Sequence, residues 1–90
     1  MVQVVWTKRA ISDLEGIRNY VAQDRPMAAD RLADKLFNAG NALDEKPDRG
    51  RRISGNRREL THIRPYLIRY RVKAGAVEIL AVRHQARKPG

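Results

Sequence analysis

The 90-residue sequence contains no cysteine, which excludes disulfide bridges, thiolate zinc sites and cysteine nucleophiles. No group of side chains has metal-ligand spacing, so we expect neither a metal nor another cofactor. No stretch approaches the roughly 20 apolar residues that cross a bilayer. The first 25 residues also lack the apolar run of a secretion signal. These absences predict a cytoplasmic protein with no membrane association.

Several nucleotide- and DNA-binding motifs are missing as well. The chain has no phosphate-binding glycine loop, which removes support for nucleotide hydrolysis. It has no helix-turn-helix pattern, aromatic stacking ladder or zinc finger. We therefore do not expect this chain, acting alone, to read the sequence of a DNA duplex.

Positive charge is abundant and unevenly distributed. Lysine and arginine number 19 against 10 acidic residues, for a formal net charge of +9, and 14 of the 19 are arginine. Residues 1–45 hold 6 basic and 7 acidic side chains, whereas residues 46–90 hold 13 and 3. Because the second half also shows the apolar alternation of a folded sheet, the charge predicts a cationic face with an anionic partner.

Hydrophobic periodicity predicts a single domain over residues 1–90, because apolar residues first recur every three or four positions and later alternate. The expected elements are a strand at 2–6, helices at 8–23 and 26–46, an Arg-rich loop at 48–57, strands at 58–64, 66–73 and 76–84, and a polar tail at 85–90. The predicted class is α+β in the order β-α-α-β-β-β. A helical hairpin would pack on one face of a small antiparallel sheet and leave the face with alternating arginines open.

The acid and base side chains of the basic half allow one plausible reaction, the metal-free cleavage of RNA through its 2′-hydroxyl. That reaction needs a Glu or His base, a His or Tyr acid, and arginines that stabilise the charged phosphate. Adjacent strands would bring Glu59, Arg69 and His84 together if their registers match, which the sequence does not decide. A structural role for each histidine is the alternative.

The arginine run at residues 49–58 has two interpretations, a solvated linker or a partner contact. Arg69 and Arg71 extend the basic surface onto a strand while the helices stay near neutral, which favours partner contact. The expected target-binding residues are Arg57, Arg58, Arg69, Arg71, Arg83 and Arg87.

Six short motifs follow one another along nearly the whole chain. They are Trp6-x3-Ala10-x2-Asp13-Leu14-x2-Ile17-x2-Tyr20-Val21, Asp24-x-Pro26-x-Ala28-Ala29, Leu43-x3-Pro47-x2-Gly50-Arg51, Arg58-Glu59-Leu60, Tyr66-Leu67-Ile68-Arg69-Tyr70-Arg71-Val72 and Val77-Glu78-Ile79-Leu80-x-Val82-x-His84-x2-Arg87. Together they resemble the RelE/ParE superfamily of bacterial toxins, which belong to type II toxin–antitoxin pairs. The resemblance implies a strand-helix-helix-three-strand fold, in agreement with the periodicity.

The resemblance favours the ParE-like branch, whose members are taken to poison DNA gyrase without nuclease chemistry. RelE-like members, which cut mRNA in the ribosomal A site, tend to carry an arginine where this chain has Leu67 and another where it has Gln85. Without these two cations a nuclease would lose much of its transition-state stabilisation.

The first alternative is a RelE-like ribosome-dependent endoribonuclease, because His84 and Arg87 occupy positions where ribonuclease members keep functional side chains. Its expected catalytic residues are Glu59, Arg64, Arg69, His84 and Arg87. The second alternative is an inactive relic that only binds antitoxin.

The resemblance also implies a partner, a ParD-like or RelB-like antitoxin with an acidic C-terminal segment that wraps the toxin in a hetero-oligomer. Apolar anchors on the helical hairpin and carboxylates on the basic sheet edge would make the contact. The expected antitoxin-binding residues are Leu14, Ile17, Leu32, Leu36, Arg51 and Arg52.

Overall fold

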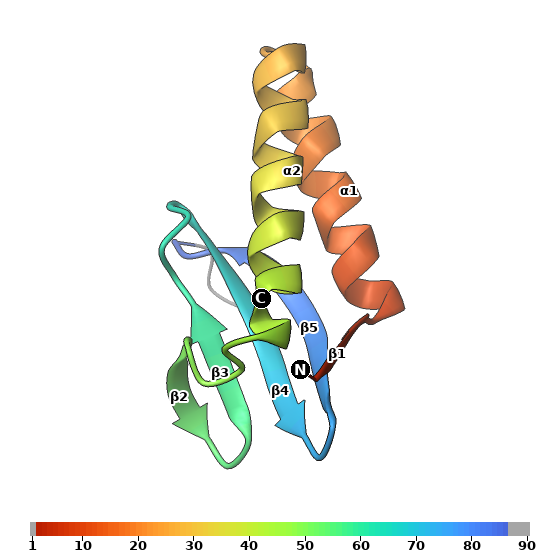
Figure 1. Cartoon of the computed structure of the whole chain (residues 1–90). Coiled ribbons are helices and arrows are strands. Elements are labelled where there is room, and N and C mark those ends of the chain that lie inside the picture. The colour runs from red at the N-terminus through yellow and green to blue at the C-terminus, as the bar shows by residue number, and fades with distance from the viewer. Residues whose placement is uncertain (1, 87–90) are drawn as a thin grey trace.

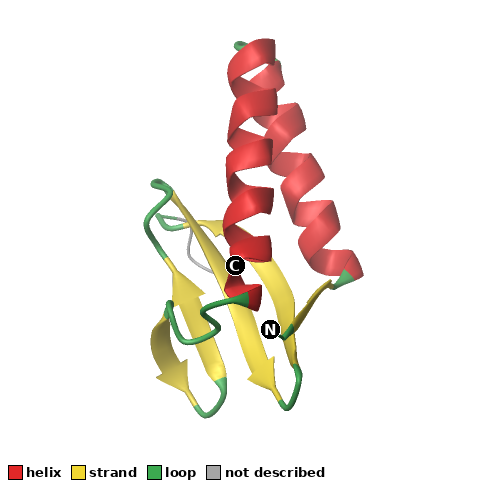
Figure 2. Ribbon diagram, viewed as in Figure 1, coloured by secondary structure: helices red, strands yellow, loops and turns green. Residues whose placement is uncertain are grey.

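The computed structural model describes residues 2–86 and shows a helical hairpin lying against a five-stranded sheet (Figure 1). The elements are β1 (Gln3–Trp6), α1 (Lys8–Ala22), α2 (Pro26–Asn41), the 3-10 turn η1 (Ala42–Asp44), β2 (Arg51–Ser54), β3 (Arg57–Leu60), β4 (Tyr66–Lys73) and β5 (Ala76–His84). The strand order is β1-β5-β4-β3-β2. Both helices lie on the same side of the sheet and extend beyond it at the hairpin tip (Figure 2).

The predicted α+β class and the helical hairpin on one sheet face are confirmed. The sheet departs from the predicted antiparallel arrangement at one edge, where β1 pairs with β5 in parallel. The other three strand pairs are antiparallel, so the sheet is mixed.

The Arg-rich segment at 48–57 is not a loop throughout, because it contains the fifth strand. β2 pairs with β3 around a tight turn in which Gly55 has a φ of +54°, a conformation that glycine adopts without strain. All four β2 residues are exposed, so the strand lacks the apolar alternation that reveals a half-buried strand in sequence. Its arginines also suit an edge strand, since edge charges oppose pairing with other chains.

Two predicted elements end earlier than expected. The second helix, predicted to reach residue 46, ends at Asn41 and tightens into η1, where the Asp44 carbonyl accepts a hydrogen bond from Val2 N–H at 3.1 Å. The strand predicted at 58–64 ends at Leu60, and the following residues turn so that Tyr66 N–H donates to the Ile63 carbonyl at 2.9 Å.

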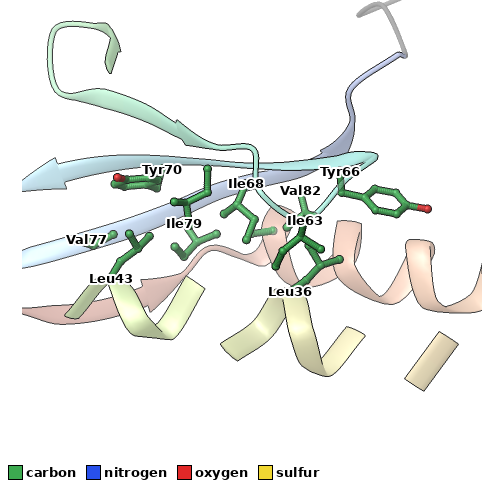
Figure 3. Packing of buried hydrophobic residues seen from close by; sticks show 11 residues of the cluster. Leu36, Leu43, Ile63, Tyr66, Ile68, Tyr70, Val77, Ile79 and Val82 are labelled. Carbon is green, nitrogen blue, oxygen red and sulfur yellow. The ribbon is translucent and has the colours of Figure 1, made fainter. Parts of the chain in front are cut away.

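The core lies between the hairpin and the helix-facing side of the sheet (Figure 3). On β4, Tyr66, Ile68 and Tyr70 are buried, as the alternation predicts. β5 is a central strand whose apolar residues first occupy odd positions, at Val77 and Ile79, and then even ones, at Leu80 and Val82. The change of phase coincides with a bulge, because the register passes from Arg69↔Ala81 to Tyr70↔Ile79 and leaves Leu80 as the extra residue. No helix within residues 2–86 is long and apolar enough to span a membrane.

Candidate functional site: the charged face of the sheet

The sheet face away from the helices carries a ladder of alternating charges. The register places Glu59 of β3 opposite Arg51 of β2 and Arg69 of β4, and it places Arg71 of β4 opposite Glu78 of β5. Directly opposed residues on one face are close enough for their side chains to interact. Strand pairing therefore puts each acidic residue beside arginines.

Glu59 is held by two guanidinium groups. Its Oε2 accepts hydrogen bonds from Arg69 Nη2 at 2.7 Å and Arg69 Nε at 3.2 Å, and its Oε1 lies 3.3 Å from Arg51 Nη2. The Glu59 side chain is 8% exposed, against 34% for Arg69 and 76% for Arg51. A carboxylate buried in this way needs both its charge and its partners, because an unpaired buried charge is costly.

A second cluster on the same face involves Glu78. Its Oε1 accepts hydrogen bonds from Arg71 at 2.6 Å and 3.0 Å and lies 3.3 Å from Lys73 Nζ. Hydrogen bonds from Arg71 and Lys73 lower the pKa of Glu78, since they favour the charged carboxylate. Arg71 and Lys73 are thus engaged within the sheet.

The predicted cations divide into engaged and unengaged groups. Within residues 2–86 no carboxylate lies within ion-pair distance of Arg57, Arg64 or Arg83. Arg58 pairs with Tyr70, which places it on the helix-facing side, and its Nη1 donates to the Asp48 and Gly50 carbonyls at 3.1 and 2.8 Å. Arg58 therefore fastens the connection between η1 and β2.

The expected grouping of Glu59, Arg69 and His84 forms only in part. Glu59 and Arg69 are paired. His84 instead lies opposite Tyr66 on the helix-facing side, and its ring meets the Tyr66 ring edge-on with centroids 5.5 Å apart. His84 Nδ1 accepts a hydrogen bond from Ala86 N–H at 3.1 Å. The described residues thus place the base and the acid of the predicted nuclease on opposite sides of the sheet, and Arg87 lies outside the described residues.

His62, the second histidine, lies in the turn after β3 and is exposed. Partial burial, followed by the charges of Arg49 and Lys35, lowers its pKa. Within residues 2–86 no three acidic or histidine side chains form a cluster suited to a metal ion.

The predicted antitoxin anchors differ in accessibility. Leu36 is completely buried in the core and offers no surface to a partner, while Leu14, Ile17 and Leu32 are partly buried against that core. Arg51 already contacts Glu59, and Arg52 is exposed with its Nε donating to the Gly55 carbonyl at 3.1 Å.

The sequence interpretation missed the group that positions the start of β2. The Tyr70 hydroxyl donates to the Pro47 carbonyl at 2.7 Å and accepts from Gly50 N–H at 2.8 Å. A Cβ at Gly50 would lie 2.7 Å from the Tyr70 ring and hydroxyl and 2.8 Å from the Glu59 carbonyl. The Pro47-x2-Gly50 spacing marks this connection in the sequence, but it does not show that Tyr70 is the residue that binds there.

Comparison with known proteins places these features among bacterial toxins. The model of the ParE toxin family of type II toxin–antitoxin system parDE matches residues 4–89. Toxin RelE2 of Caulobacter vibrioides is 49% identical over 87 residues, covering 97% of this chain and 99% of that toxin. Toxin RelE3 of the same species is 38% identical over 79 residues, covering 84% and 86%. A chain of the chromosomal ParDE TA system from P. aeruginosa shares the fold, with a TM-score of 0.82, 24% identity and coverage of 93% of this chain and 96% of that one.

Proposed function

Because the chain belongs to the ParE toxin family of type II toxin–antitoxin systems, we propose that it arrests growth by interfering with DNA gyrase until a cognate antitoxin neutralises it. The observation that carries this proposal is the enclosure of Glu59 by Arg51 and Arg69. Both oxygens of this carboxylate already accept hydrogen bonds from arginines, which suits a structural role and leaves neither oxygen available for proton transfer.

The separation of the acid–base groups supports the same proposal. A general base and a general acid must both reach the reacting atoms, and His84 lies on the face of the sheet opposite Glu59. By the family resemblance, Leu67 and Gln85 also stand where RelE-like members tend to carry arginines. A toxin that acts by binding needs neither an acid and a base at one site nor these two arginines.

In this proposal the target contacts three predicted arginines that form no ion pair with a carboxylate of residues 2–86. Arg57 and Arg64 are exposed and Arg83 is half-buried, so their guanidinium groups can contact an anionic partner without breaking an ion pair. Arg69 and Arg71 serve mainly to hold the face in shape. An acidic C-terminal antitoxin segment, ParD-like or RelB-like, would cover the same cations in a cytoplasmic hetero-oligomer and block the target.

A gyrase supercoiling assay with antitoxin-free protein tests the proposal. We expect inhibition at micromolar concentration, weakened by at least about tenfold in the double variant Arg57→Ala/Arg83→Ala, because each removes a charge-assisted contact. Arg25→Ala/Arg31→Ala is the matched control, since it removes two exposed arginines from the helical hairpin. Folded wild-type protein that leaves supercoiling unchanged would contradict the proposal.

A ribosome-dependent endoribonuclease is the second candidate, favoured by the names of the relatives RelE2 and RelE3. It predicts codon-phased cuts in mRNA after induction, abolished by His84→Ala or Arg87→Ala. Growth arrest with intact transcripts would exclude it. Unimpaired growth on induction would instead identify an inactive antitoxin-binding relic.

A further inference from the structure

The turn between β3 and β4, residues 61–65, carries one of the arginines that the target is proposed to contact. Arg64 lies in this turn, is exposed, and forms no ion pair with a carboxylate of residues 2–86. Ile63 is the one buried residue of the turn, and its carbonyl accepts a hydrogen bond from Tyr66 N–H at 2.9 Å. Neither contact involves Arg64 itself, so its position depends on what holds the turn.

Gln85, the first residue after β5, ties this turn at both of its ends. Its Nε2 donates to the Thr61 carbonyl at 3.3 Å and to the Tyr66 carbonyl at 3.1 Å. Its backbone N–H donates to the Pro65 carbonyl at 2.7 Å. A glutamine amide carries two N–H groups, so the turn engages both donors of this side chain. Figure 1 shows the turn between β3 and β4 close to the end of β5.

The sheet itself does not depend on the Gln85 side chain. The pairing of β4 with β5 ends at Tyr66↔His84, and Pro65 has no N–H with which to continue the ladder. Gln85 is exposed and lies outside the buried core cluster. Hydrogen bonds at such a position contribute to local order more than to the stability of the whole domain.

We propose that Gln85 is a positioning residue for target recognition, which holds the 61–65 turn so that Arg64 presents its guanidinium group to an anionic group of the target. This inference rests on the proposed function, because it takes Arg64 to be a target contact. A residue that precedes proline is already restricted to extended backbone conformations. Gln85 adds to this restriction by holding the Pro65 carbonyl and the carbonyls on either side of the turn.

The physical gain is preorganisation. An arginine on a loose turn would lose backbone as well as side-chain freedom when it binds, whereas an arginine on a fixed turn loses only the latter. The amide of Gln85 is neutral, so it orders the turn without competing with Arg64 for the bound anion. Glutamate at this position would have no N–H to donate to the three carbonyls.

The test is a double-mutant cycle in the gyrase supercoiling assay, with purified wild type, Gln85→Ala, Arg64→Ala and the double variant. We expect Gln85→Ala to weaken inhibition by about fivefold in the wild-type background, the equivalent of about one neutral hydrogen bond, and by less than about twofold when Arg64 is already alanine. A general loss of folded protein would weaken inhibition equally in both backgrounds. Gln23→Ala is the matched control, because it removes an exposed glutamine side chain at the end of α1, and it should inhibit as the wild type does.

Two further measurements identify the hydrogen bonds as the cause. Gln85→Met keeps a side chain of similar length without its N–H donors, so it should weaken inhibition as much as Gln85→Ala does. Hydrogen exchange reports the turn without gyrase: the Tyr66 amide, which donates to the Ile63 carbonyl, should exchange at least about threefold faster in both variants.

The outcomes separate this inference from the proposed function. Equal losses on Gln85→Ala in the two backgrounds would make Gln85 a purely structural residue and overturn the inference. Wild-type inhibition by Gln85→Met, or unchanged Tyr66 exchange in Gln85→Ala, would overturn it as well while the gyrase target stands. Wild-type protein that leaves gyrase unaffected would overturn the proposed function together with the recognition role of Arg64.

Discussion

The Tyr70 hydroxyl reaches across from the middle of β4 and fixes the backbone at Gly50, one residue before β2 begins. It accepts from Gly50 N–H at 2.8 Å and donates to the Pro47 carbonyl at 2.7 Å, and the tyrosine is completely buried. Since Arg51 follows Gly50 directly, this pair of residues determines where the first arginine of the charged ladder begins.

Removing the hydroxyl should destabilise the protein without changing its fold. Tyr70→Phe leaves the Gly50 N–H and the Pro47 carbonyl without their partner, which costs about 1–3 kcal/mol in the free energy of unfolding. Urea denaturation measures the difference. Tyr20→Phe is the control, because Tyr20 is 63% exposed, and it should change stability by less than about 0.5 kcal/mol. Equal stability of the two variants would show that the Tyr70 hydroxyl does not hold this connection.

The same tyrosine predicts a loss of stability at alkaline pH. Burial raises the pKa of Tyr70 above its ordinary value of 10.0. Above pH 10 the unfolded chain releases the phenol proton while the folded state retains it, so the free energy of unfolding falls until the folded pKa is passed. The stability difference between wild type and Tyr70→Phe should therefore shrink as the pH rises above 10. A difference that stayed constant across this range would contradict the assignment.

Two glycine-to-alanine substitutions should change stability in opposite directions. Gly50→Ala places a Cβ 2.7 Å from the Tyr70 ring and 2.8 Å from the Glu59 carbonyl, and such overpacking costs about 1–3 kcal/mol. Gly16→Ala adds a Cβ that meets nothing within 4 Å at an exposed position of α1, and it should stabilise the protein by about 1 kcal/mol. Thermal unfolding of both variants checks the signs. Destabilisation by Gly16→Ala would show that the fold itself needs this glycine.

The long elements of the fold were predictable because each carries a clear periodicity. α1 and α2 repeat apolar residues every three or four positions, and β4 alternates strictly, so their positions follow from the sequence. β2 was not predictable from its pattern, because a fully exposed edge strand has no buried face to create one. Its pairing depends on the turn at Gly55 and on contacts with β3.

The candidate site was predictable in composition but not in geometry. The pairing of Glu59 with Arg69 was among the expected registers, whereas the bulge at Leu80 shifts the phase along β5 and contributes to the position of His84 beside Tyr66. A single extra residue reverses which face later side chains occupy. A groove between α1 and the end of β5 was not predictable either, because residues 9–20 form one wall and residues 66 and 82–84 form the other.

Glu59→Gln distinguishes a structural carboxylate from a catalytic one. The amide keeps the shape but loses the charge that holds Arg51 and Arg69, so stability should fall by about 1–3 kcal/mol, while inhibition of gyrase by the folded fraction should change by less than about threefold. A general base contributes about 10²–10⁴-fold to a rate, so a nuclease would lose at least about a hundredfold in mRNA cleavage. Glu78→Gln is the matched control, because it removes the other paired carboxylate of the same face. A selective hundredfold loss of toxicity in Glu59→Gln, with normal folding by circular dichroism, would assign Glu59 to chemistry and overturn the binding mechanism.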